Sequence, residues 1–257
     1  MTDVDGLAGK RSLVLCGTRG IGLGVAQCLA RRGSTVTISG RDARRAAEAA
    51  EGLPGGGHGS FACDFGDPAE VGARVAATGP YDVVLLNSPG FGPGRVDELS
   101  AALLQDAVRL MLLPFQSTAE AVLPAMKDAG WGRLIAITSS SLRAPISGLA
   151  GSTIARSAVR SYLELLAESA APHGITVNHV LPGKIDTERL RAVEAATAER
   201  RGTTPEQVRG DTLRTIPLGR YGTPQDIGEL VAFLASDRAA YITGTGIRCD
   251  GGYPAPA

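Results

Sequence analysis

An apolar run followed by a glycine cluster lies near the amino end of the chain, as Ser12-Leu13-Val14-Leu15-Cys16-Gly17-Thr18-Arg19-Gly20-Ile21-Gly22. The first four residues show no apolar/polar alternation, which predicts a strand that is buried on both faces. Residues 24–32 have a helical pattern that ends at Gly33. Glycines between a first strand and a first helix let the backbone turn sharply and approach a pyrophosphate, to which the helix N-terminus offers oriented N–H groups. The stretch therefore predicts a dinucleotide-binding turn.

The alternation of strand and helix continues to the carboxyl end of the chain. Further strands are predicted at residues 35–39, 60–63, 83–86, 134–138, 176–181 and 246–249, and helices at 42–51, 100–128, 153–171 and 224–235. This order predicts an α/β fold with a single Rossmann-type, doubly wound parallel sheet, helices on both faces and right-handed crossovers. The 257 residues contain no repeat, linker or composition shift, so we expect one domain over residues 1–257.

The composition excludes several classes of protein. Lysine and arginine together number 26, as do aspartate and glutamate, which argues against a nucleic-acid binder or a membrane-surface protein. The four cysteines lie far apart without metal-ligand spacing, so neither a disulfide framework nor a metal site is expected. The first residues are acidic and no apolar run approaches the ~20 residues of a membrane span. These features predict a cytoplasmic protein.

The segment 182–217 is rich in arginine and glutamate and has helical patterns at residues 187–201 and 205–214. It follows a strand end directly, and open α/β sheets bind their ligands at the carboxyl ends of the strands. We predict a lid at residues 186–216; the alternative is a solvated excursion from the fold.

The end of the second strand bears on which dinucleotide is preferred. An acidic side chain there would bind a ribose 2′-hydroxyl and repel a 2′-phosphate. This chain has Gly40 followed by Arg41, and arginine forks suit phosphate oxygens. The sequence favours NADP (NADPH) over NAD. For Arg44 and Arg45, the simpler interpretation is that they lie on a solvent-exposed face of a helix and do not bind the cofactor.

At this point the chain resembles the short-chain dehydrogenase/reductase family, in its 3-oxoacyl-carrier-protein reductase-like branch, from about residue 10 to 253. The resemblance rests on the glycine turn, Asp64, Asn87-Ser88-Pro89-Gly90, Ser139, Pro182-Gly183-Lys184-Ile185-Asp186-Thr187, Ile242-Thr243-Gly244 and Asp250-Gly251-Gly252. It implies that Asp64 bonds the adenine, Asn87 contacts the cofactor ribose region and Thr187 binds the nicotinamide amide. The full set expected to hold the cofactor is Gly17, Thr18, Arg19, Gly20, Ile21, Gly22, Arg41, Asp64, Phe65, Asn87, Gly90, Arg156, Pro182, Gly183, Ile185 and Thr187.

The chain departs from the family pattern at two places. Cys16 stands where the family has the first glycine of its turn. The family also uses a tyrosine, a lysine four residues later and an asparagine on an earlier helix; these positions fall on Ser152, Arg156 and Met111. No Tyr-x-x-x-Lys occurs anywhere in the chain. A serine hydroxyl is far less acidic than a phenol, and an arginine holds its proton too tightly to relay it.

The candidate catalytic residues that remain are Ser139, Ser152, Arg156 and Lys184, with Ser140, Ser141 and Arg143 as candidate substrate contacts. Their positive charge would suit an anionic substrate or intermediate. Alternatively, Arg156 clamps cofactor ribose hydroxyls and Lys184 belongs to a solvated loop. His179 is read as a near-core histidine.

The predicted function is an atypical NADP-dependent oxidoreductase that transfers hydride between NADP(H) and a carbonyl or alcohol on a small, anionic or activated substrate. Because the usual proton donor is missing, two alternatives stay open: a non-redox lyase, dehydratase, isomerase or cyclase, and a non-catalytic partner subunit. The apolar helical stretches 100–128 and 153–171 predict a homodimer or homotetramer.

Overall fold

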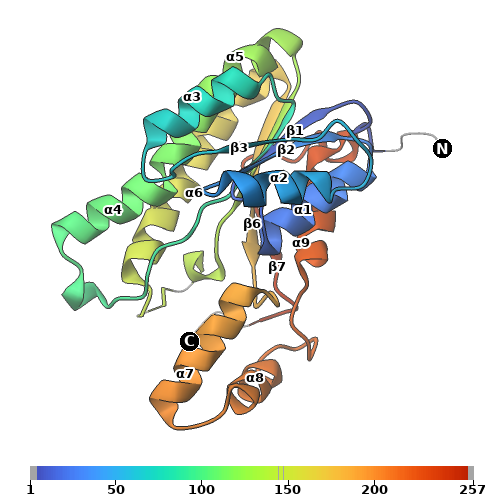
Figure 1. Ribbon diagram of the computed structural model, residues 1–257. Coiled ribbons are helices and arrows are strands. Elements are labelled where there is room, and N and C mark those ends of the chain that lie inside the picture. The colour runs from blue at the N-terminus through green and yellow to red at the C-terminus, as the bar shows by residue number, and fades with distance from the viewer. Residues whose placement is uncertain (1–4, 144, 147, 254–257) are drawn as a thin grey trace.

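Seven parallel strands form one sheet in the order β3-β2-β1-β4-β5-β6-β7 (Figure 1). The computed structural model describes residues 5–143, 145–146 and 148–253. The strands are β1 (Arg11–Val14), β2 (Thr35–Gly40), β3 (Gly59–Ala62), β4 (Val83–Leu86), β5 (Gly132–Ile137), β6 (Ile175–Pro182) and β7 (Gly246–Cys249). The predicted doubly wound α/β architecture is confirmed. All carboxyl strand ends lie at one edge, where such sheets bind ligands.

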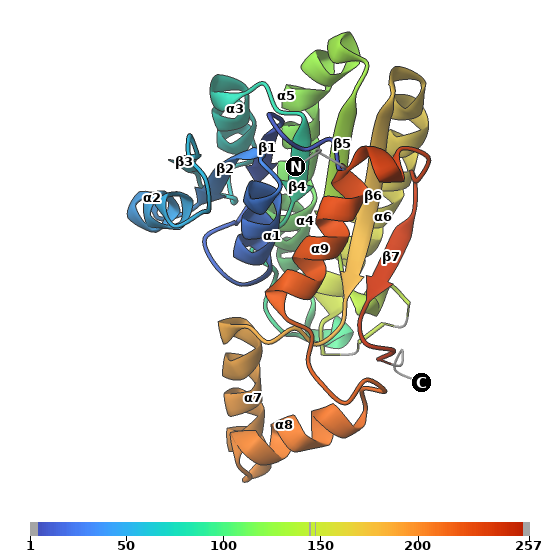
Figure 2. The ribbon, with the colours of Figure 1, turned by 90° about the vertical axis from the view of Figure 1, so that its right-hand side faces the viewer.

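Helices cover both faces of the sheet, as Figure 2 shows. On one face, α1 (Gly20–Arg31) and α9 (Pro224–Ala235) share a core cluster with residues of β1 and β2. On the other face, α3 (Pro68–Thr78), α5 (Leu113–Ala129) and α6 (Ala150–Ala170) share a second cluster with β4 and β5. The inner strands β1, β4, β5 and β6 are almost wholly buried, as expected of a parallel sheet, whereas the edge strands β3 and β7 are partly exposed. The shorter helices α2 (Ala43–Glu51) and α4 (Ala101–Met111) lie at the periphery.

Most predicted elements are found within a few residues of their predicted bounds, and three differ. The predicted helix at 24–32 begins earlier, at Gly20, so the glycine turn runs straight into α1. The apolar helical stretch predicted over 100–128 is divided into α4 and α5, because the chain bends at Leu112 and restarts with Pro114 in the first turn of α5. Helix α3 was not predicted, although Asp67-Pro68 is a typical helix start and the Asp67 side chain caps it.

Two further helices, α7 (Glu188–Arg201) and α8 (Pro205–Arg214), project beyond the carboxyl edge of the sheet (Figure 2). Asp186 anchors them by accepting hydrogen bonds from Arg191 and Arg209, both at 3.0 Å. The buried carboxylate of Glu194 accepts a hydrogen bond from the Tyr221 hydroxyl. These contacts hold the helix pair to the turn that follows β6. Among the described residues, no helix has the length and apolar character needed to cross a bilayer.

Candidate active site

The glycine turn places the N-terminus of α1 at the carboxyl edge of the sheet. Arg19 is the N-cap residue, but its side chain makes no capping hydrogen bond, and the first turn of α1 has no acidic residue. The first N–H groups of a 12-residue helix are therefore open to an anion. Gly20 has φ of +56°, a left-handed conformation that glycine adopts without steric cost.

Cys16 is the departure from the glycine pattern, and its backbone shows what the position demands. Its φ is +51°, and no other non-glycine residue in the described part of the chain has a positive φ. The fold keeps a glycine-like conformation with a cysteine in it, at a cost of about 1–2 kcal/mol. Burial raises the pKa of the Cys16 thiol, so the side chain is neutral and adds no negative charge beside a bound phosphate.

The strain at Cys16 gives a first prediction. Cys16→Gly is expected to be about 1 kcal/mol more stable to unfolding than Cys16→Ala, because both lose the thiol and only alanine keeps the Cβ that the left-handed conformation disfavours. Denaturant unfolding of the two variants measures the difference. Equal stability, or a more stable alanine variant, would show that the position carries no such strain.

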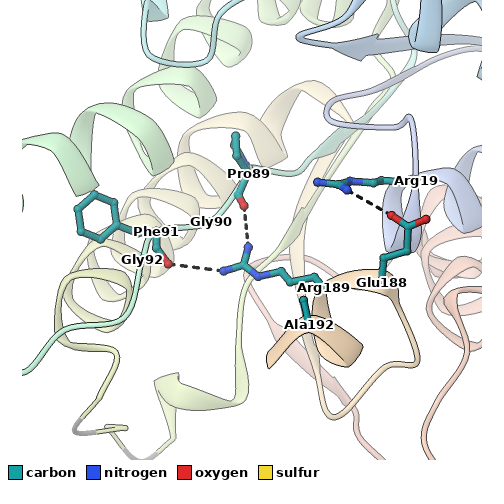
Figure 3. A pocket seen from close by; sticks show the side chains of 8 residues that line it. All are labelled: Arg19, Pro89, Gly90, Phe91, Gly92, Glu188, Arg189 and Ala192. Atoms are coloured by element: carbon teal, nitrogen blue, oxygen red, sulfur yellow. Dashed lines mark hydrogen bonds and ion pairs between the residues drawn. The ribbon is translucent and has the colours of Figure 1, made fainter. Parts of the chain in front are cut away.

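A pocket of about 530 Å³ opens between the glycine turn, the loop after β4 and the N-terminus of α7 (Figure 3). Eight residues line it: Arg19, Pro89, Gly90, Phe91, Gly92, Glu188, Arg189 and Ala192. Arg19 and Gly90 belong to the predicted cofactor-binding set, and the structure brings them to one cavity. The pocket lies at the carboxyl edge of the sheet, where the sequence predicted a ligand site.

Two side chains of α7 close the pocket on one side. Glu188 forms an ion pair with Arg19 at 3.2 Å, and Arg189 donates hydrogen bonds to the carbonyls of Pro89 at 2.6 Å and Phe91 at 3.5 Å (Figure 3). Gly90 makes this possible, since a Cβ there would lie 2.1 Å from Nη1 of Arg189. The start of α7 is thus tied to both the glycine turn and the loop after β4.

The serines and Arg156 gather at the end of β5. Ser139 caps a short 3₁₀ turn, its Oγ accepting the Ser141 N–H at 3.1 Å. That contact uses a lone pair of Ser139 and leaves its O–H available to donate. Ser152 is buried in the first turn of α6, and its Oγ accepts from Nε of Arg156 at 3.3 Å.

Arg156 is fixed against the backbone of the strand that carries Ser139. Its Nη1 donates to the carbonyls of Ile137 at 3.1 Å and Thr138 at 2.7 Å. Burial, together with the positive charge of Arg189, lowers the pKa of Arg156 to about 10. At neutral pH the guanidinium is still charged, so it holds positive charge against the backbone that leads into Ser139.

The remaining predicted residues are dispersed along the same edge. Asn87 donates from Nδ2 to the Cys16 carbonyl at 3.5 Å, and exposed Asp64 accepts from the Gly66 N–H at 2.8 Å. Thr187 caps α7 through the Leu190 N–H at 3.3 Å and lies beside Gly20. Buried Met111 packs with Ala107 and Ala155, with Phe91 against them.

The other predicted substrate contacts differ in exposure. Ser141 is buried, Ser140 half-buried and Arg143 exposed. Lys184 is half-buried and lies over the ring of Tyr253, 5.6 Å from its centroid. Among the predicted cofactor residues, Phe65, Pro182 and Ile185 are buried and Arg41 is exposed.

The sequence did not predict Phe91, Glu188 and Arg189 as part of the site. Glu188 and Arg189 follow the predicted residue Thr187 directly, but their contacts cross 169 and 100 positions of the chain, and spacing cannot reveal such contacts. Phe91 is a large apolar residue in a stretch rich in glycine and proline, and that contrast is a usable sequence signal.

Comparison with known proteins identifies the family. A family model described as enoyl-(acyl carrier protein) reductase matches residues 16–254. D-beta-hydroxybutyrate dehydrogenase of Cupriavidus necator is 31% identical, with 97% of this chain and 99% of that protein covered. The 3-oxoacyl-acyl-carrier-protein reductase FabG of Escherichia coli is also 31% identical, with 95% and 97% covered. The chain belongs to the short-chain dehydrogenase/reductase family.

The fold of this dehydrogenase/reductase agrees with that assignment. The crystal structure of L-sorbose reductase from Gluconobacter frateurii, complexed with NADPH and L-sorbose, matches with a TM-score of 0.90 at 23% identity, covering 98% of this chain and 99% of that one. By family the chain is an oxidoreductase, as the 3-oxoacyl-carrier-protein reductase-like resemblance implied.

Proposed function

We propose that this short-chain dehydrogenase/reductase transfers hydride between NADP(H) and a carbonyl or alcohol carbon of a small anionic substrate. The observation that carries the proposal is the open, uncapped N-terminus of α1 beside a cavity of about 530 Å³ at the carboxyl edge of the sheet. The named relatives are dehydrogenases and reductases, and the L-sorbose reductase structure contains NADPH. Nothing in the site favours the non-redox alternatives, so a single function is proposed.

The residues present fit a dinucleotide. The N–H groups at the start of α1 would hold the pyrophosphate. Thr187, Asn87 and Asp64 lie at the same carboxyl edge of the sheet. A side chain at position 40 would clash with Thr18, since a Cβ there would lie 2.6 Å from Thr18 Cγ2. No carboxylate can therefore replace Gly40 without displacing Thr18, and Arg41 is free to meet a 2′-phosphate.

NADPH, when bound, supplies the hydride. The chain's own contribution begins with Ser139, whose O–H is free to donate to the substrate oxygen. Arg156, held behind it by two carbonyls, places positive charge where negative charge grows on that oxygen. Ser152 is fixed in the same cluster by Nε of Arg156.

The charge around the pocket supports an anionic substrate. Arg189 lines the cavity, and its positive charge adds to the effect of burial in lowering the pKa of Arg156. Arg19 also lines the cavity, where it is paired with Glu188. Arginine forks bind carboxylates and phosphates with two hydrogen bonds, so a substrate carboxylate or phosphate is suited to this cavity. A lid formed by residues 186–216 belongs to the same proposal, since Glu188 and Arg189 already contact the pocket wall.

An oligomer is part of the proposal as well. The large apolar side chains of Leu103, Leu113, Ile154 and Leu165 are exposed on α4, α5 and α6. These are the helical stretches in which the sequence predicted a subunit interface, and burying their side chains would be favourable. A homodimer or homotetramer is expected by sedimentation; a monomer at all concentrations would contradict it.

Cofactor preference gives a second prediction. Arg41→Ala is expected to weaken NADPH binding about 10- to 100-fold and to leave NADH binding unchanged, because a hydrogen bond to a charged group contributes about 1.5–3 kcal/mol. Fluorescence titration of both nucleotides measures the effect. Arg44→Ala is the matched control, since that exposed side chain pairs with Glu48 on its own helix. An equal loss for NADPH and NADH would contradict the assigned role of Arg41.

The proposal itself is tested by titrating the protein with NADPH and then following its oxidation at 340 nm against a panel of β-keto acids and β-keto thioesters. Saturable binding and turnover of one of these compounds are expected. Failure to bind NADPH at millimolar concentration would overturn the proposed function.

A further inference from the structure

A second cavity, of about 280 Å³, lies beside the pocket and takes no part in the function proposed above. Residues 91–95 of the loop after β4 line it, together with Glu98, Leu99 and Leu103 near the start of α4 and Gly151 of α6. We call it the α4 cavity. Phe91 and Gly92 line the pocket as well, so the two cavities share one stretch of wall.

Phe91 contributes a different part to each cavity. Its carbonyl accepts a hydrogen bond from Nη2 of Arg189 at 3.5 Å, and Figure 3 shows its ring directed away from that arginine. The ring packs on the apolar cluster around buried Met111. A Cβ at Gly151 would lie 3.0 Å from two of its ring atoms, so the ring also rests on the first turn of α6. Phe91 therefore stands between the pocket and the α4 cavity.

The α4 cavity reaches the groups that are proposed to bind the substrate oxygen. Gly151, in its wall, directly precedes Ser152, whose Oγ accepts from Nε of Arg156 at 3.3 Å. The same arginine donates to the carbonyl of Thr138, the residue before Ser139, at 2.7 Å. A substrate with its oxygen on Ser139 can therefore extend into the α4 cavity.

The lining of the α4 cavity favours an apolar group. Four lining residues have apolar side chains: Phe91, Pro93, Leu99 and Leu103. The two charged ones are engaged at their own 3₁₀ turn, since the Arg95 guanidinium is paired with Asp97 at 2.9 Å and Oε2 of Glu98 accepts the Arg95 N–H at 3.1 Å. Apolar side chains and glycine backbone are left to meet a ligand. Burying each CH₂ of a chain against such a surface strengthens binding about fourfold.

The wall of the α4 cavity is held in place by the backbone. The Gly94 N–H donates to the Gly148 carbonyl at 2.9 Å, and the Ala150 N–H donates to the Gly94 carbonyl at 3.0 Å. These bonds join the loop after β4 to the segment that leads into α6, as a parallel bridge. Because the cavity exists before a ligand enters it, little ordering of the protein opposes binding.

We propose that the α4 cavity receives an apolar group of the substrate and that Phe91 limits how bulky that group can be. This inference rests on the proposed function. The substrate class is then a 3-oxo acid that carries an alkyl chain on the far side of its carbonyl from its carboxylate, with the carboxylate toward Arg189 in the pocket. Phe91 is a specificity-determining residue: its ring leaves room for an unbranched chain and excludes a branched or aromatic group beside the carbonyl.

Two variants change the α4 cavity in opposite directions. Phe91→Ala removes the ring and is expected to raise kcat/KM for 3-oxo-3-phenylpropanoate about tenfold or more relative to acetoacetate, with the Kd for NADPH unchanged. Leu99→Trp fills the cavity, because Cδ1 of Leu99 would lie 3.4 Å from a Cβ at Gly151. It is expected to lower kcat/KM for 3-oxooctanoate about tenfold and to affect acetoacetate, whose methyl group is small, much less. Val96→Trp is the matched control, since this exposed residue of the adjacent 3₁₀ turn does not line the cavity.

A second readout does not require turnover. Octanoate and butyrate have no carbonyl to reduce, and calorimetry of the native protein is expected to show about tenfold or more higher affinity for octanoate. Leu99→Trp is expected to remove that difference and Val96→Trp to preserve it. Equal affinity of the native protein for the two acids, or a folded Phe91→Ala enzyme with the native preference for acetoacetate over 3-oxo-3-phenylpropanoate, would overturn the inference. If Phe91→Ala does not fold, the Leu99→Trp comparison decides. A protein that prefers octanoate but oxidises no NADPH with any of these 3-oxo acids would instead overturn the proposed function.

Discussion

Ser139→Ala is expected to lower kcat for carbonyl reduction by about 10²–10³-fold, with the affinity for NADPH unchanged. Removal of one donor that stabilises a developing oxyanion has an effect of this size. Ser139 is positioned for that role because its Oγ accepts the Ser141 N–H, which fixes the hydroxyl and leaves its proton to donate. Steady-state kinetics at saturating NADPH, together with nucleotide titration, separate turnover from binding.

Ser161→Ala is the matched control for this experiment. Ser161 is an exposed serine on α6 whose hydroxyl donates to the Ser157 carbonyl within its own helix. We expect native activity from that variant. If Ser139→Ala retained native kcat, the oxyanion would have to be stabilised elsewhere, and the cluster at the end of β5 would lose its assigned role.

Gly22→Ala is expected to weaken NADPH binding by at least about 10²-fold. A Cβ at Gly22 would lie 2.4 Å from the Cys16 carbonyl oxygen and 2.9 Å from the Gly17 Cα, and both of these are backbone atoms of the turn itself. The turn must move to accept the methyl group, which displaces the N–H groups at the start of α1. Losing one or two hydrogen bonds to a charged phosphate accounts for an effect of this size.

Gly56→Ala controls for the loss of a glycine as such, because nothing lies within 4 Å of a Cβ at that exposed loop position. Fluorescence titration with NADPH measures binding, and thermal unfolding shows how far the variant remains folded. A folded Gly22→Ala protein with native NADPH affinity would contradict the placement of the pyrophosphate at the glycine turn.

The sequence predicts the framework of the fold well because the framework depends on local patterns. The bounds of β4, β7 and α9 are predicted to the residue; β4 is an apolar run between Asp82 and Asn87, and Thr223-Pro224 marks the start of α9. The start of α1 is predicted four residues late, because the glycines that open the helix carry no apolar pattern. Helix α3 was missed because only Val71 and Val75 are buried in it, so its apolar residues form a weak helical pattern.

The site is only partly predictable, for a physical reason. Ser139, Ser152 and Arg156 come together because strand β5 and helix α6 are consecutive in the fold, and the sequence named all three. Glu188 and Arg189 act through contacts with Arg19 and the loop after β4, and these depend on where the lid packs.

The central claim is that hydride moves from NADPH to a substrate carbon at the carboxyl edge of the sheet, although the usual tyrosine and lysine positions hold Ser152 and Arg156. Turnover of a β-keto substrate with NADPH carrying two deuterium atoms at C4 of the nicotinamide tests this most directly. Mass spectrometry of the product is predicted to show one deuterium, bound to the carbon that bears the new hydroxyl group. A product without deuterium, or one formed without consumption of NADPH, would contradict the account.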